Sequence, residues 1–81
     1  MEEMQKYAQE IPLGVYRHFK GNEYEVIGLA YDSEDMSVKV VYRALYGNRD
    51  LWVRDASMWC EYVEREGVSV RRFTPVSDSH N

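Results

Sequence analysis

The residues with the clearest capacity for chemistry lie between Lys39 and Arg54. Within this stretch four cations accompany a single acid, Asp50, although the whole chain has a net charge of −4. Aromatic side chains are interleaved with these cations, at Tyr42, Tyr46 and Trp52. Aromatic faces stack on bases or fill a partner's pockets, and arginines form directed hydrogen bonds. The stretch therefore predicts a binding surface, with a packed core and a solvated outer face as the plainer alternative.

His18 is the residue best suited to acid–base chemistry. A hairpin turning at Gly21-Asn22 would place His18 opposite Glu25, and a carboxylate can orient a histidine as a general base. The same pair would also hold the hairpin together, and we favour that interpretation because no nucleophile lies nearby. Cys60 is the single cysteine, and we interpret it as a small buried apolar side chain.

Composition narrows the function classes. Ten Lys and Arg against 14 Asp and Glu argue against a dedicated nucleic-acid binder, which usually has a domain-wide basic excess. The acidic start and the lack of a long apolar run predict neither a signal peptide nor a membrane span, so we expect a cytoplasmic protein. One cysteine excludes an internal disulfide and a zinc site built on several thiolates. We expect no metal and no cofactor.

Short β-rich runs separated by turn signals are the pattern of an all-β domain. We expect residues 1–12 to be an acidic segment, either a short helix or disordered, and 75–81 to be a disordered tail. A single β-barrel domain is expected over 13–74, with an ordered body from about Leu13 to Phe73. The predicted strands are 13–19, 24–31, 37–46, 51–54, 61–64 and 68–73, with one helical or 3-10 turn over 55–59.

Closure of such a sheet would remove exposed edges, so five or six strands predict a small SH3-like antiparallel barrel. Gly28, in the middle of a predicted strand, indicates a bend or bulge there. A two-residue loop at Gly21-Asn22 would pair Phe19 with Tyr24 and His18 with Glu25.

Several motifs carry a family resemblance: Gly14-x-Tyr16-x-His18-Phe19-Lys20-Gly21-Asn22-x-Tyr24-x-Val26, Val41-Tyr42-Arg43-Ala44-Leu45-Tyr46-Gly47, Leu51-Trp52-Val53-Arg54, Met58 and Trp59. Over about Leu13 to Phe73 the chain resembles a short bacterial domain-of-unknown-function family, numbered 1653. It departs from the family pattern at Asp55, where proline is usual. The resemblance implies a compact β domain of the bacterial cytoplasm and supplies no activity, substrate or cofactor.

These observations together predict a non-catalytic interaction module with an aromatic and basic face. The expected partner is a protein or peptide, including a second copy of the chain, and no membrane is involved. Binding of single-stranded RNA or DNA through the same face is the first alternative, and a small enzyme using His18 is the second. The predicted binding residues are Tyr16, His18, Tyr42, Arg43, Tyr46, Trp52 and Arg54.

Overall fold

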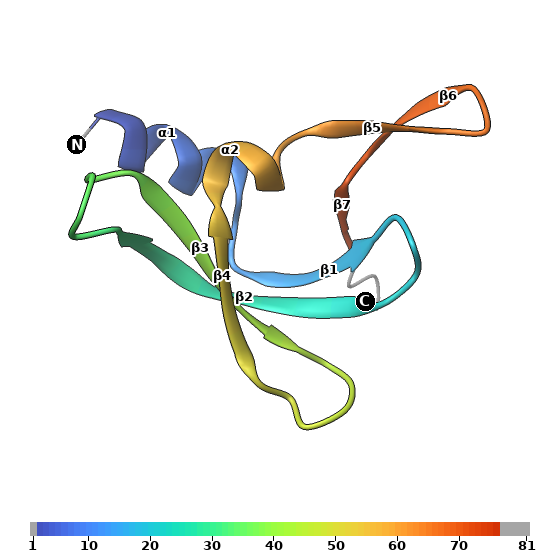
Figure 1. The fold of residues 1–81 in the computed structure, drawn as a ribbon, viewed down its shortest axis with the longest axis horizontal. Coiled ribbons are helices and arrows are strands. Elements are labelled where there is room, and N and C mark those ends of the chain that lie inside the picture. The colour runs from blue at the N-terminus through green and yellow to red at the C-terminus, as the bar shows by residue number, and fades with distance from the viewer. Residues whose placement is uncertain (1, 77–81) are drawn as a thin grey trace.

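The structure is a computed structural model, and it describes residues 2–76. Most of its elements are strands. Both helices lie against one central strand, β3, and the hairpin of β5 and β6 extends away from the larger sheet (Figure 1). Within residues 2–76 neither helix is long and apolar enough to cross a bilayer. In chain order the elements are α1 (Glu2–Glu10), β1 (Gly14–His18), β2 (Glu23–Tyr31), β3 (Val38–Ala44), β4 (Leu51–Asp55), α2 (Ala56–Trp59), β5 (Tyr62–Arg65), β6 (Val68–Arg71) and β7 (Phe73–Pro75).

Five strands form one antiparallel sheet in the order β4-β3-β2-β1-β7, and β5 and β6 form a second sheet of their own. The predicted all-β class is therefore confirmed. The sheets do not close into a barrel: among the described residues, β4 and β7 each pair on one side only. The closed SH3-like barrel is not confirmed, and two strand edges stay open where closure was expected to remove them.

The core lies on one face of the large sheet. Every second residue of β3 is buried, and the residues between them are half-buried. Val40 in β3 and Ala56 in α2 are fully buried. Met4 and Tyr7 of α1 pack against this core. Ile11 is only 2% exposed, so the packed body begins before Leu13.

The two ends of the chain differ in how far the structure describes them. The N-terminal segment, for which helix and disorder were both open, forms α1. At the C-terminus Pro75 was expected to begin a disordered tail, but it is the last residue of β7. Most of that predicted tail, residues 77–81, lies outside the described residues.

Strand β2 contains the irregularity that Gly28 predicted. Val26 lies opposite Tyr42 and Gly28 lies opposite Val41, so Ile27 is an extra residue in the ladder. An extra residue bends the strand and strengthens its twist. On the C-terminal side of this bulge Leu29, rather than Gly28, shares the core face with Val40.

The register predicted for the first hairpin is wrong. Arg17 lies opposite Glu23 and Tyr16 opposite Tyr24. Strand β1 ends at His18 and β2 begins at Glu23, so residues 19–22 connect them. The His18 carbonyl accepts the Gly21 N–H at 2.7 Å, and the His18 N–H donates to the Asn22 carbonyl at 2.8 Å. This longer loop brings Arg17 and Glu23 into an ion pair of 2.8 Å. The predicted Phe19–Tyr24 and His18–Glu25 pairs therefore do not form.

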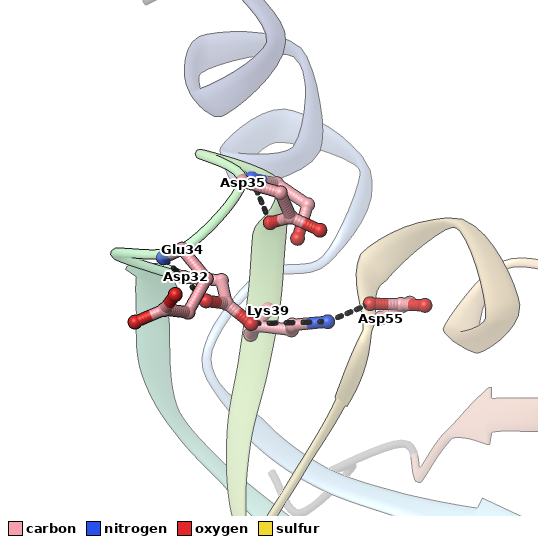
Figure 2. A network of polar contacts seen from close by, with 6 residues as sticks. Asp32, Glu34, Asp35, Lys39 and Asp55 are labelled. Atoms are coloured by element: carbon pink, nitrogen blue, oxygen red, sulfur yellow. Dashed lines mark hydrogen bonds and ion pairs between the residues drawn. The ribbon is translucent and has the colours of Figure 1, made fainter.

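The loop between β2 and β3 fixes a lysine that the sequence assigned to the basic stretch. Figure 2 shows the Lys39 amino group between the carboxylates of Asp55 and Asp32. Asp32 and Asp35 also accept the backbone N–H groups of Glu34 and Ser37, at 2.8 and 2.9 Å. Lys39 therefore holds the start of β3 to the end of β4 and is not an unpaired cation.

Candidate functional site

A cluster of aromatic rings fills the core beneath the predicted binding face. Phe73 stacks on Trp59 with ring centroids 3.7 Å apart and planes 1° from parallel. Tyr16 and Tyr42 meet Trp59 edge-on, at 5.4 and 4.9 Å. These two tyrosines are only 2% and 6% exposed. The prediction that Tyr16 and Tyr42 contribute exposed surface is wrong, because the sheet register places both on the core face.

A small aromatic hollow opens beside this cluster, at the end of the sheet near the β3–β4 turn. Its volume is about 200 Å³, and we call it the aromatic hollow; its lining residues are Tyr24, Tyr42, Tyr46 and Trp52. The Tyr24 and Tyr46 hydroxyls are hydrogen-bonded at 2.8 Å. Burial, followed by this hydrogen bond, raises the pKa of Tyr24 to about 12. The Tyr24 phenol is therefore uncharged near pH 7.

The sequence predicted three of these four rings as binding residues and missed Tyr24. Tyr24 lies opposite Ala44, beside the Val26–Tyr42 pair, so it shares the core face with Tyr42. The signal that would have found it is the correct register of β2 against β3. Tyr46 and Trp52 are 46% and 54% exposed, so they form the rim of the aromatic hollow that a partner can reach.

Strand β4 presents an open apolar edge next to the aromatic hollow. Leu51, Trp52 and Val53 are consecutive and are 53%, 54% and 62% exposed. Among the described residues β4 pairs only with β3. Proteins usually protect a sheet edge with charge, proline or a covering segment. Leu51, Trp52 and Val53 stand on such an edge with their side chains more than half exposed.

The two predicted arginines lie on opposite faces of the sheet. Arg54 lies opposite Val40 and so belongs to the core face, where its guanidinium carbon is 5.6 Å from the Phe73 ring centroid. Its Nε is buried without a hydrogen-bond partner among residues 2–76. Arg43 belongs to the other face and donates to the Arg49 carbonyl at 2.9 Å. The structure does not bring Arg43 and Arg54 together.

His18 is half-buried at the far side of the sheet from β4. Its Nδ1 accepts the Lys20 N–H at 3.1 Å, and its ring lies 5.0 Å from Phe73. Burial, then the positive charges of Arg54, Arg72 and Lys20, lower its pKa. Glu25 lies opposite Val15, so it does not orient His18 as predicted.

A second hollow, of about 330 Å³, adjoins His18. We call it the basic hollow, because its titratable lining residues are Arg17, His18, Arg65 and Arg71. No carboxylate lines it within the part of the chain that the structure describes. A general base paired with an acid, as the enzyme alternative requires, is therefore not assembled there.

Cys60 does not have the environment of a nucleophile. Burial, followed by the nearby Glu10 carboxylate, raises the pKa of its thiol. The Sγ lies 3.7 Å from a Glu10 carboxylate oxygen, and the residue packs against the core. A thiol that stays protonated is a poor nucleophile, so Cys60 helps to attach the end of α1.

Comparisons with known proteins agree with this fold and assign no activity. A crystal structure of a DUF1653 protein from Bordetella bronchiseptica is similar, with 37% sequence identity and a TM-score of 0.77, over 84% of this chain and 90% of that chain. Comparison with curated proteins finds no significant match. The model of the family described as "Protein of unknown function (DUF1653)" matches residues 14–75. The resemblance noted in the sequence is therefore confirmed, and the chain belongs to the DUF1653 family.

Proposed function

We propose that this domain is a non-catalytic interaction module that binds an extended peptide segment of a partner protein along β4. The observation that carries the proposal is the exposure of Leu51, Trp52 and Val53 on an edge strand that pairs on one side only. An extended peptide adds to such an edge through main-chain hydrogen bonds, and alternate side chains provide specificity.

The ladder identifies which backbone groups of β4 are available. The Ala44 N–H donates to the Asp50 carbonyl at 3.1 Å, so this is a hydrogen-bonded antiparallel pair. Hydrogen-bonded pairs alternate along an antiparallel ladder, so Trp52, opposite Tyr42, also directs its backbone groups toward β3. The N–H and C=O groups of Leu51 and Val53 then point outward. These are the groups that an added strand would bond.

The aromatic hollow supports the choice of a peptide with apolar side chains at alternate positions. Trp52 lies on the core face of β4 and lines the aromatic hollow, whereas its neighbours Leu51 and Val53 belong to the other face. A side chain of the added strand beside Trp52 would fill the aromatic hollow. Because Lys39 is paired with Asp32 and Asp55, the cations left near β4 are arginines. Their positive charge favours acidic residues on either side of the apolar peptide segment that binds β4.

Proline at position 53 tests this mode of binding. Proline removes the outward N–H of Val53 and leaves the ladder between β3 and β4 intact, because edge strands tolerate proline on their unpaired side. Dodecapeptides selected from a random displayed library on the wild-type protein should bind Val53→Pro about tenfold more weakly or worse. Val53→Thr is the matched control, since it keeps both the N–H and the β-branched shape, and it should bind as the wild type does.

Three results would contradict the proposal. Selection could enrich no peptide, or the selected peptides could bind Val53→Pro as tightly as Val53→Thr. Sedimentation could instead show a wild-type dimer that Val53→Pro dissociates, which would assign the edge to a second copy of the chain. Trp52→Ala provides a second arm, because it empties one wall of the aromatic hollow and should weaken binding while the main-chain groups remain.

Binding of single-stranded nucleic acid is the competing function, and ionic strength separates the two. Affinity for a mixed oligonucleotide should fall steeply with salt because binding releases counterions. An apolar peptide contact should change little. Because Tyr42 is buried, the rings left for stacking on bases would be Tyr46 and Trp52.

A further inference from the structure

The basic hollow lies between the two sheets and gathers positive groups from distant parts of the chain. Arg17 and His18 come from β1, Arg65 from the end of β5, and Arg71 from the end of β6. Apolar lining comes from Val70 and from the neighbouring β7 segment. Within residues 2–76, three arginines are among the lining residues of the basic hollow and no carboxylate is, although the chain has a net charge of −4 and one of the three, Arg17, is paired with Glu23. Such an arrangement stabilises an anion better than it stabilises the fold.

The three arginines retain donors for a ligand. Arg65 donates to the Phe19 carbonyl, which ties the β5–β6 hairpin to the loop after β1. Arg17 pairs with Glu23, and both side chains are well exposed. The Arg71 side chain forms no hydrogen bond or ion pair within residues 2–76, although its charge acts on Tyr16 and Cys60. A guanidinium has five N–H donors in a fixed plane, so each of the three has donors left.

The hydrogen bond to His18 defines which ring nitrogen is left to donate. Nδ1 accepts the Lys20 N–H, so in the neutral ring the proton lies on Nε2. Contacts with Phe19 and Phe73, at centroid distances of 4.5 and 5.0 Å, fix the ring. Since burial and neighbouring cations lower its pKa, the neutral form prevails near pH 7. In this form the Nε2–H of His18, a residue that lines the basic hollow, is an uncharged donor.

We infer that the basic hollow binds the phosphate group of a small phosphate monoester, held by Arg17, Arg65 and Arg71. Donors from separate strands suit a tetrahedral dianion with several acceptor oxygens, whereas a flat carboxylate is satisfied by one bidentate arginine. The organic part of the ester would lie on the apolar lining, Val70 and Pro75. The inference concerns the opposite side of the sheet from β4 and does not rest on the peptide proposal.

Two NMR titrations test the inference, with inorganic phosphate and phenyl phosphate as the probes. Both should produce saturable shifts in the signals of His18 and Arg71, and phenyl phosphate should bind more tightly because its ring covers the apolar lining. Acetate at equal ionic strength should produce none of these shifts. Bound phosphate should also raise the His18 pKa, because a dianion stabilises the imidazolium form.

Variants keep the test specific. Arg71→Gln should weaken phosphate binding about tenfold or more, as expected for the loss of charge-assisted hydrogen bonds. Arg49→Gln removes one exposed positive charge from the β3–β4 turn, away from the basic hollow, and should bind as the wild type does. A retained wild-type amide spectrum shows that each variant is folded, and Arg17→Gln replaces Arg71→Gln if the latter is not.

Clear results would overturn the inference. Equal weakening by Arg49→Gln would indicate general electrostatic attraction, and equal shifts with acetate would indicate an unselective anion site. Saturation by inorganic phosphate with no change in the His18 pKa would place the anion elsewhere. Tighter binding of an oligonucleotide than of phenyl phosphate would assign the basic hollow to a nucleic-acid backbone instead.

Discussion

Replacing Phe73 with leucine would break the ring stack that attaches β7 to the core. Phe73 is 1% exposed and stacks on Trp59 at 3.7 Å, and the Arg54 guanidinium lies on the ring at 5.6 Å. Leucine keeps most of the buried volume and removes the Trp59 stack and the Arg54 contact. It also removes the edge-on contacts of the Phe73 ring with His18, Tyr24 and Tyr42. Because β7 also forms a wall of the basic hollow, the same change should weaken phosphate binding without removing an arginine.

The expected loss follows from these contacts. An aromatic pair contributes about 0.5–1.5 kcal/mol beyond burial, and a hydrophobic change of shape costs less than about 1.5 kcal/mol. Phe73→Leu should therefore lower the free energy of unfolding by about 1–2 kcal/mol. A chain of 81 residues has a total of about 4–12 kcal/mol, so the variant should remain folded. With a urea slope of about 1 kcal/mol/M, the midpoint should fall by about 1–2 M.

A double-mutant cycle isolates the stack. Urea unfolding followed by circular dichroism would compare Phe73→Leu, Trp59→Leu and the double variant, with an expected coupling of about 0.5–1.5 kcal/mol. Trp52→Leu is the control, since Trp52 is 54% exposed; alone it should change stability by less than about 0.5 kcal/mol. Coupling between Phe73 and Trp59 below about 0.3 kcal/mol would refute the reasoning.

Three titrations and reactions follow from the described environments. Tyr46→Phe should lower the pKa of Tyr24 from about 12, because it removes a hydrogen bond that favours the neutral phenol. A pH titration followed by phenolate absorbance measures the pKa of Tyr24, and an unchanged pKa would contradict the hydrogen bond between Tyr24 and Tyr46. The pKa of His18 in the folded protein lies below its unfolded value of about 6.5. The unfolded chain therefore binds more protons between these two pKa values. The free energy of unfolding should fall as the pH drops through about 6.5 and then through the folded pKa. His18→Gln should reduce this loss in urea unfolding measured on both sides of about pH 6.5, and an identical loss would exclude His18 as its source. Iodoacetamide should alkylate Cys60 more slowly in the folded protein than in urea. Among folded proteins, alkylation should be faster in Glu10→Gln than in the wild type. Equal rates for these two folded proteins would show that Glu10 does not suppress the thiolate.

Much of the fold could be predicted because alternation and turn residues are local signals. Six of the predicted strand segments and the helical turn near Trp59 correspond to observed elements. The seventh strand, Phe73–Pro75, was missed because only its pairing with β1 makes it a strand, and proline obscures the pattern. Sheet closure was expected from a general tendency to avoid open edges. The proposed peptide partner on β4 would satisfy the same tendency without closure.

Which of the predicted binding residues are exposed could be predicted only in part, because exposure depends on strand pairing as well as on local sequence. Tyr46 and Trp52 were correctly expected to be accessible, since they adjoin a turn and an edge. Tyr16 and Tyr42 were not, because which face of a strand is buried depends on strands distant in sequence. The His18–Glu25 pair depended on a two-residue loop, and a loop of four residues moved every partner in that hairpin.

The bulge at Ile27 divides β2 into two parts with different neighbours. Tyr24 and Val26, before it, line or adjoin the aromatic hollow and the ring cluster, whereas Leu29, after it, faces Val40 deeper in the core. An insertion or deletion at this point would invert the inward and outward positions of one part while leaving the other unchanged. A chain of the same fold without the extra residue would have to exchange apolar and polar positions downstream to keep the same core.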